Sequence, residues 1–160
     1  MGARTHHYQL RVTWTGNQGQ GTASYNAYSR SHEISAPGKA SIEGSSDPEF
    51  HGDAARWSPE DLLVASLSGC HKLWYLGLCA KEGIVVLSYE DDAEGSMAED
   101  GKGSGQFTEV VLRPKVVVAA RADVEKAKAL HHTAHEKCFI ARSVNFAVRC
   151  EPAISIRSYV

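Results

Sequence analysis

The pattern of apolar and polar positions predicts several strands and two helices. Polar and apolar residues alternate over 8–15, which is typical of a half-buried strand, and the glycine-rich segment 16–21 indicates a turn. A second strand is predicted over 22–29, and 32–35 either continues it or opens a third. The segment 37–53 is rich in Gly, Ser and Asp and predicts a long surface loop. Further strands are predicted over 85–89, 107–119 (interrupted by Pro114), 144–148 and 153–156.

The first helix is predicted to begin at Ser58 and to end at Gly83. Ser58 is a good N-cap, Pro59 fits the first helical position, and the acidic residues that follow favour the positive end of the helix dipole. Apolar residues continue on most sides of this helix as far as Leu78, so we expect it to be largely buried.

The second helix is predicted over 122–137, where Val124, Ala127, Leu130 and Ala134 form an apolar stripe. Together with the strands, the two helices predict an α+β fold in which antiparallel strands wrap around two long central helices. A length of 160 residues, without an internal repeat or linker, favours a single domain over 1–160.

Composition narrows the class of protein. The chain is 42% hydrophobic and 22% charged, as in ordinary soluble proteins, and its net charge of −2 argues against a nucleic-acid partner. No apolar run approaches the ~20 residues that span a membrane, and the first residues lack the apolar core of a secretory signal. Four cysteines do not make a disulfide scaffold in a chain of this size, so a reducing, cytoplasmic location is expected.

Two of the cysteines occupy distinctive positions. Cys70 lies in the middle of the first predicted helix, where a cysteine is usually part of the core. Cys138 lies at the end of the second helix, where it is well placed to meet another thiol. This arrangement suggests a thiol that attacks a peroxide and a second thiol that resolves the product. Cys79 and Cys150 are expected to be core residues.

The two cysteine segments carry a resemblance to a known family. The segment 58–83, with its opening Ser-Pro-Glu-Asp and its Ser-Gly-Cys at 68–70, resembles the long cysteine-bearing helix of the OsmC/Ohr family of hydroperoxide reductases. The His-Glu-Lys-Cys of 135–138 resembles the family's second cysteine motif. The order of elements is also similar, so the likeness covers nearly the whole chain. It implies an OsmC-like α+β fold and an intertwined homodimer.

The resemblance also implies an activity. Cys70 would reduce an organic hydroperoxide, and possibly hydrogen peroxide as well, and would become a sulfenic acid. Cys138 would then form a disulfide with Cys70, and an external dithiol or a lipoyl-bearing protein would restore both thiols. No flavin, haem or metal cofactor is implied. The alternative is a non-catalytic stress protein of the same fold that binds a small apolar ligand at the dimer interface.

Cys70 must react as a thiolate, and an ordinary thiol is only a few per cent ionised at neutral pH. Cys70 lies too far along its helix for the helix dipole to help, so a nearby cation is required. In the family this cation is an arginine held by a glutamate, and Glu60 matches that glutamate. Arg56 is the favoured arginine and Arg30 the second choice; the alternative for each is a solvated surface charge.

A metal site is the main rival interpretation. His131, His135 and Cys138 follow one another at i, i+4 and i+7, which places them on one helix face with spacing that suits zinc. A further ligand would have to come from His32, His51 or His71. The chain lacks a His-Glu-x-x-His core and a Cys-x-x-Cys knuckle, so solvated histidines are favoured and no metal is expected.

Overall fold

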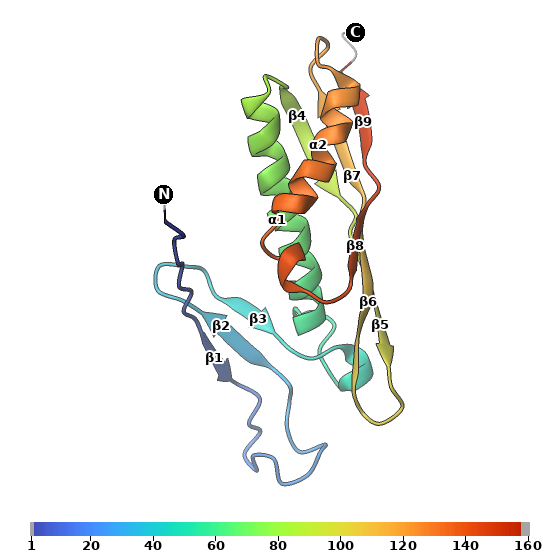
Figure 1. The fold of residues 1–160 in the computed structure, drawn as a ribbon. Helices are drawn as coiled ribbons and strands as arrows, with labels where there is room; N and C mark the ends of the chain where they lie inside the picture. The colour runs from blue at the N-terminus through green and yellow to red at the C-terminus, as the bar shows by residue number, and fades with distance from the viewer. Residues whose placement is uncertain (1, 158–160) are drawn as a thin grey trace. The chain divides into compact units, whose positions relative to one another are not determined.

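A computed structural model describes residues 2–157 and divides the chain into two compact units, Met1–Leu62 and Leu63–Val160 (Figure 1). The first unit contains a small sheet and the start of helix α1. The second contains the rest of α1, helix α2 and six strands.

The first unit is built on a three-stranded antiparallel sheet. Its strands are β1 (Arg11–Trp14), β2 (His32–Ser35) and β3 (Ile42–Gly44), in the order β1-β2-β3. A short 3₁₀ helix, η1 (Pro48–Phe50), follows. Every residue of β1 is exposed, and no hydrophobic side chain is buried between residues 2 and 62. The sheet is therefore held by its backbone ladder rather than by a core of its own.

Two predictions for this unit are wrong. The segment 22–29 forms turns instead of a strand, because the guanidinium of Arg30 donates hydrogen bonds to the backbone carbonyls of Tyr25 and Tyr28, at 2.7 and 2.8 Å, and lies over both rings. A side chain thus occupies carbonyls that a strand would use for its ladder. The predicted loop over 37–53 contains β3 and η1; Asp47 caps η1 by accepting a hydrogen bond from the backbone N–H of Glu49 at 2.8 Å.

The second unit contains two mixed sheets, with the strand orders β4-β7-β9 and β5-β6-β8. The β4–β7 and β5–β6 pairs are antiparallel, whereas β6–β8 and β7–β9 are parallel. Short connections lead from β4 to β5, from β6 to β7 and from β8 to β9, so the chain passes from one sheet to the other at each of these points (Figure 1). The strands are β4 (Val86–Asp91), β5 (Glu94–Glu99), β6 (Gly105–Leu112), β7 (Pro114–Val118), β8 (Ala147–Cys150) and β9 (Ala153–Ile156).

The expected α+β fold is confirmed, and the parallel pairs are an addition to the antiparallel strands that were expected. The predicted strand over 107–119 is two strands, because the chain breaks the ladder at Arg113, just before Pro114. Strand β5 was not predicted. Its six residues are all exposed, so they carry no apolar alternation that could reveal a strand.

Both predicted helices are confirmed: α1 spans Pro59–Lys81 and α2 spans Val124–Lys137. At the start of α1 the backbone N–H of Ser58 donates to the Asp61 carboxylate at 3.0 Å, and the N–H of Asp61 donates to Ser58 Oγ at 3.1 Å, as in a capping box. Gly83, with φ of 72°, adopts the left-handed conformation that ends such a helix.

The core of the second unit lies between the helices and the sheet strands (Figure 1). Helix α1 buries a stripe with i, i+4 spacing, on which Leu67, His71, Tyr75 and Cys79 all lie. Helix α2 buries Ala127, His131 and Ala134, and both helices pack against the valines of β7. Two histidines therefore occupy positions that normally belong to apolar residues.

By length and composition alone, α1 could cross a membrane, contrary to the expectation that no run of the chain is long enough. One such helix is a weak indication, because the core helix of a soluble protein passes the same test. The buried stripe of α1 packs within the hydrophobic core of the second unit, as in a core helix.

Candidate functional site

Cys70 and Cys138 are in side-chain contact, and both are free thiols. Cys70 lies on α1 and is partly exposed. Cys138 is the C-cap of α2, is only 1% exposed, and its sulfur accepts a hydrogen bond from the backbone N–H of Ala141 at 3.4 Å. The end of α2 thus brings a second thiol close to Cys70, and the catalytic roles of the two thiols stay predictions.

The two thiols have different surroundings. Burial raises the pKa of Cys138; the hydrogen bond from Ala141 acts in the opposite direction, and the contact with Cys70 raises the pKa further. Cys138 is therefore protonated at neutral pH. Cys70 is the thiol that a dissolved molecule reaches first.

Apolar side chains lie exposed next to both cysteines in the sequence. Leu73, one turn after Cys70, is 68% exposed, and Phe139, directly after Cys138, is 67% exposed. The ring of Phe139 packs edge-on against Trp74 with a centroid separation of 5.8 Å, which ties this segment to α1. The surface near the thiol pair is suited to an apolar molecule.

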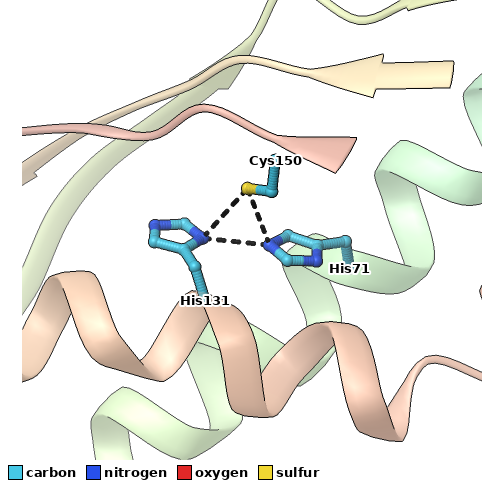
Figure 2. A group of neighbouring side chains, drawn as sticks. All are labelled: His71, His131 and Cys150. Atoms are coloured by element: carbon cyan, nitrogen blue, oxygen red, sulfur yellow. Dashed lines mark hydrogen bonds between the residues drawn. The ribbon is translucent and has the colours of Figure 1, made fainter. Parts of the chain in front are cut away.

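A second cluster, the His71–His131–Cys150 group, lies in the same unit (Figure 2). The three side chains come from α1, α2 and β8. Nε2 of His71 lies 2.9 Å from Nδ1 of His131, and Sγ of Cys150 lies 3.7 and 3.8 Å from these two nitrogens. The His131 ring also stacks on the ring of Tyr75, with centroids 3.8 Å apart.

Burial dominates the protonation of this group. It lowers the pKa of His71 to about 4, although the Asp91 carboxylate acts in the opposite direction. Burial and the neighbouring His71 ring lower the pKa of His131 to about 3. Both imidazoles are therefore neutral at physiological pH. Burial, with Asp91 and Glu151, raises the pKa of the Cys150 thiol to about 12.

The group also contains an unpartnered polar atom. Nε2 of His131 is buried and has no hydrogen-bond partner among the described residues. Its other ring nitrogen, Nδ1, faces His71 and Cys150. His131 thus contributes all of its polar contacts to this group.

The other predicted site residues belong to the first unit. Arg56 lies 3.6 Å from the Glu43 carboxylate and 3.8 Å from that of Asp53, and it is half-buried. Arg30 is bound by the carbonyls of Tyr25 and Tyr28 as described above. Oε2 of Glu60 is buried and has no hydrogen-bond partner within residues 2–157. The roles of Glu60, Arg56 and Arg30 in activating Cys70 stay predictions.

The histidines that come together are not the set predicted on one face of the second helix. Within the part of the chain that the structure describes, the only set of three potential metal ligands that converge is His71, His131 and Cys150, without His135 or Cys138. Cys150 was expected to be a core residue. Its partners lie 79 and 19 residues away, so only the tertiary fold reveals the group. A histidine on the most apolar stripe of α1 was the one signal in the sequence.

The chain belongs to the OsmC-like protein family, whose model matches residues 51–152. An OsmC-like protein of unknown function from Vibrio cholerae has a similar structure: it is 35% identical with a TM-score of 0.84, and the match covers 93% of this chain and 100% of that one. No curated protein sequence matches the chain.

More distant solved structures share the fold. An organic hydroperoxide resistance protein from Elizabethkingia anophelis is 17% identical, with a TM-score of 0.66 over 96% of this chain and 100% of that one. The organic hydroperoxide resistance protein OhrB of Bacillus subtilis is 22% identical, with a TM-score of 0.59 over 91% of this chain and 98% of that one. At these identities the likeness establishes the fold alone.

Proposed function

We propose that this protein is a cytoplasmic, thiol-dependent peroxidase that reduces organic hydroperoxides. The observation that carries the proposal is the contact between a partly exposed thiol, Cys70, and a buried, protonated thiol, Cys138. The exposed apolar surface of Leu73 and Phe139 favours an organic hydroperoxide over hydrogen peroxide. Membership of the OsmC-like family supports the same chemistry.

The reaction balances without a cofactor. The Cys70 thiolate attacks the distal oxygen of the hydroperoxide, the O–O bond breaks, and the substrate leaves as an alcohol once it takes up a proton. Cys70 is then a sulfenic acid. The Cys138 sulfur attacks the Cys70 sulfur, water leaves, and a disulfide forms. An external dithiol, such as a lipoyl group, reduces this disulfide by two electrons and is itself oxidised.

Activation of Cys70 is assigned to an arginine held by Glu60, with Arg56 favoured and Arg30 second. The cation would stabilise the thiolate and the negative charge that develops on the leaving oxygen. Oε2 of Glu60 is buried without a hydrogen-bond partner among the described residues, which supports the proposal that an arginine donates a hydrogen bond to it in the active form. Glu60 and Cys70 are ten residues apart on α1, which is about 15 Å at the usual helical rise, so an arginine on Glu60 would hardly reach Cys70 of the same chain.

A homodimer would bring an arginine held by Glu60 close to a Cys70 thiol in spite of this distance. If two copies pair with their α1 helices antiparallel, Glu60 of one copy comes beside Cys70 of the other. The exposed apolar strands of the first unit supply a surface that a second copy could cover.

The alternative function is binding of a small apolar ligand without catalysis. An open hollow of about 360 Å³ favours it, because its lining is apolar. The lining residues are Leu76, Ala80, Gly83, Ile84, Val85 and Val86.

Mass spectrometry after one equivalent of cumene hydroperoxide separates the two functions. A peroxidase loses two hydrogens and yields a peptide pair joined through Cys70 and Cys138. The Cys138→Ser variant should instead gain one oxygen atom on Cys70. A protein whose thiols stay unchanged while hydroperoxide persists is the ligand binder.

A further inference from the structure

We propose that His71, His131 and Cys150 bind a single transition-metal ion, zinc or copper, with a fourth position left open. The site is separate from the Cys70–Cys138 pair and does not depend on the proposed peroxidase activity. It replaces the expectation that the chain holds no metal, which was based on a different set of residues.

The spacing of the three donor atoms fits one ion. They are separated by 2.9, 3.7 and 3.8 Å, and a circle through three such points has a radius of about 2.0 Å. Zinc binds histidine nitrogen at about 2.0–2.1 Å and thiolate sulfur at about 2.3 Å. An ion that lies slightly out of the plane of the three atoms, as in a tetrahedral site with one open position, therefore reaches all three donors at bonding distance.

The donor atoms converge on this point from three directions (Figure 2). Two ligands stand on helices and the third on a strand, and all three elements belong to the same packed unit. His131 is held further by the ring of Tyr75 stacked on it. Rigid elements fix ligand geometry better than loops do, so little reorganisation is needed to receive an ion.

The chemistry of the donors selects the kind of metal. Two neutral imidazoles and one thiolate suit zinc and copper, whereas magnesium and calcium require oxygen ligands. The thiol of Cys150 gives up its proton when the metal binds, so the complex with a divalent ion carries one net positive charge. The Asp91 carboxylate influences both His71 and Cys150, and its negative charge offsets this positive charge.

Asp91 itself is positioned as an outer partner instead of a ligand. One of its carboxylate oxygens accepts a hydrogen bond from Ser68 Oγ at 2.6 Å, and the other accepts from the backbone N–H of Arg113 at 2.7 Å. Each oxygen thus accepts one hydrogen bond, and Asp91 does not converge with the three ligand atoms. Three protein ligands and an open fourth position resemble the arrangement of catalytic zinc sites, in which water or a small ligand completes the tetrahedron.

The test uses the full chain, purified without a histidine tag and reduced with a phosphine. Its metal content is measured first, and the metal-free protein is then titrated with Co²⁺, Zn²⁺ and Cu²⁺. We expect one ion per chain, a thiolate-to-cobalt charge-transfer band in the near ultraviolet, and loss of that band when Zn²⁺ is added. Tighter retention of zinc or of copper identifies the native metal.

Matched variants locate the site. Cys150→Ser should remove the charge-transfer band, and His131→Gln should weaken Co²⁺ binding by at least about tenfold, as expected for loss of a ligand. His132→Gln is the control, because His132 is the next residue on α2 but is exposed and pairs with Glu136. Cys70→Ser should bind metal normally, which separates this site from the peroxide-reducing thiols.

Two outcomes overturn the proposal. One is wild-type protein that takes up Co²⁺ and Zn²⁺ only weakly or well below one ion per chain; this result does not depend on whether any variant folds. The other is a charge-transfer band that survives in folded Cys150→Ser, as judged by circular dichroism. In either case the three residues are a hydrogen-bonded part of the core.

Discussion

The two units of the chain differ in where they keep their apolar side chains. The second unit encloses two hydrophobic clusters between its helices and strands. Between residues 2 and 62 no hydrophobic side chain is buried, and the apolar residues of the first strand and its approach face outward: Tyr8 is 89% exposed and Leu10 is 65% exposed. The second unit therefore has a hydrophobic core of its own, whereas the first unit has none and leaves apolar side chains exposed.

Polar contacts within the first unit do not supply the stability that a hydrophobic core would give. Its ion pairs, such as Arg56 with Glu43, are long and have exposed carboxylates, and such pairs near the surface contribute about 0–1 kcal/mol. The units also differ in the residues they hold. The second unit holds the thiols and the histidine cluster, and the first holds Glu60, Arg30, Arg56 and an exposed apolar surface, to which the proposed function gives a role in the site of a second copy.

The largest expected effect is in the second unit. Cys70→Ser should abolish consumption of cumene hydroperoxide, because Cys79 and Cys138 are buried and the raised pKa of Cys150 keeps that thiol protonated. Peroxide loss is followed with a dithiol in excess. Ser66→Ala, at an exposed position of the same helix, should leave the rate unchanged. Retention of more than about a tenth of the activity in Cys70→Ser would remove Cys70 from its assigned role.

Cys138→Ser should stop turnover but spare the first step. The Cys70 thiolate still attacks the peroxide, and without its partner the sulfenic acid persists. Dimedone should label Cys70 stoichiometrically after one equivalent of hydroperoxide, as measured by peptide mass spectrometry. Normal cycling of this variant with a dithiol would show that Cys138 does not resolve the sulfenic acid.

A mixing experiment tests whether the first unit of one chain serves the second unit of another. Inactive Cys70→Ser and inactive Glu60→Ala chains are refolded together. If sites are shared, each heterodimer has one site with both lesions and one intact site, and it recovers up to half of the wild-type activity. If each chain builds its own site, mixing restores nothing. Wild-type protein refolded in the same way is the control.

The smallest expected effect is a pH dependence of stability. Because the pKa of Cys138 is raised in the folded protein, its stabilising contribution is present below the ordinary thiol pKa, near 9, and is lost as the pH rises above it. Each unit of pKa shift corresponds to about 1.4 kcal/mol. The free energy of unfolding of the wild type, measured with urea, should therefore fall more steeply between about pH 9 and about pH 11 than that of Cys138→Ala. Parallel pH profiles would contradict this.

Local signals explain which parts of the fold were predictable. The start and end of α1 follow from Ser58, Asp61 and Gly83, which act on neighbouring residues. The turns over 22–29 depend on Arg30, whose side chain reaches back to carbonyls earlier in the chain. Strand β5 depends on pairing with β6 and has no buried face, so its own residues carry no pattern.

The candidate site also has one part that was predicted from the sequence and one part that was not. The pairing of Cys70 with Cys138 was predicted because the two motifs resemble those of a family. The pairing of His71 with His131 and Cys150 has no local signal, since the three residues come from elements that are brought together only by packing. The helical spacing of His131, His135 and Cys138 was misleading because α2 ends at Lys137, and Cys138 is a C-cap with an extended backbone that no longer follows the helix.

Consecutive residues of α1 lead to two different partners. Cys70 meets Cys138 of the segment that ends α2, and His71 meets His131 two turns earlier on α2. The Cys70–Cys138 pair and the His71–His131 pair are therefore neighbouring contacts of α1 with α2 and its C-terminal end. A disulfide between Cys70 and Cys138 would draw α1 and the end of α2 together, and a change in the separation of the helices would also change the distance between the two imidazoles. If the disulfide forms, the distance between the two histidines should therefore depend on the oxidation state of the two thiols, because both pairs join α1 to α2 or its C-terminal end.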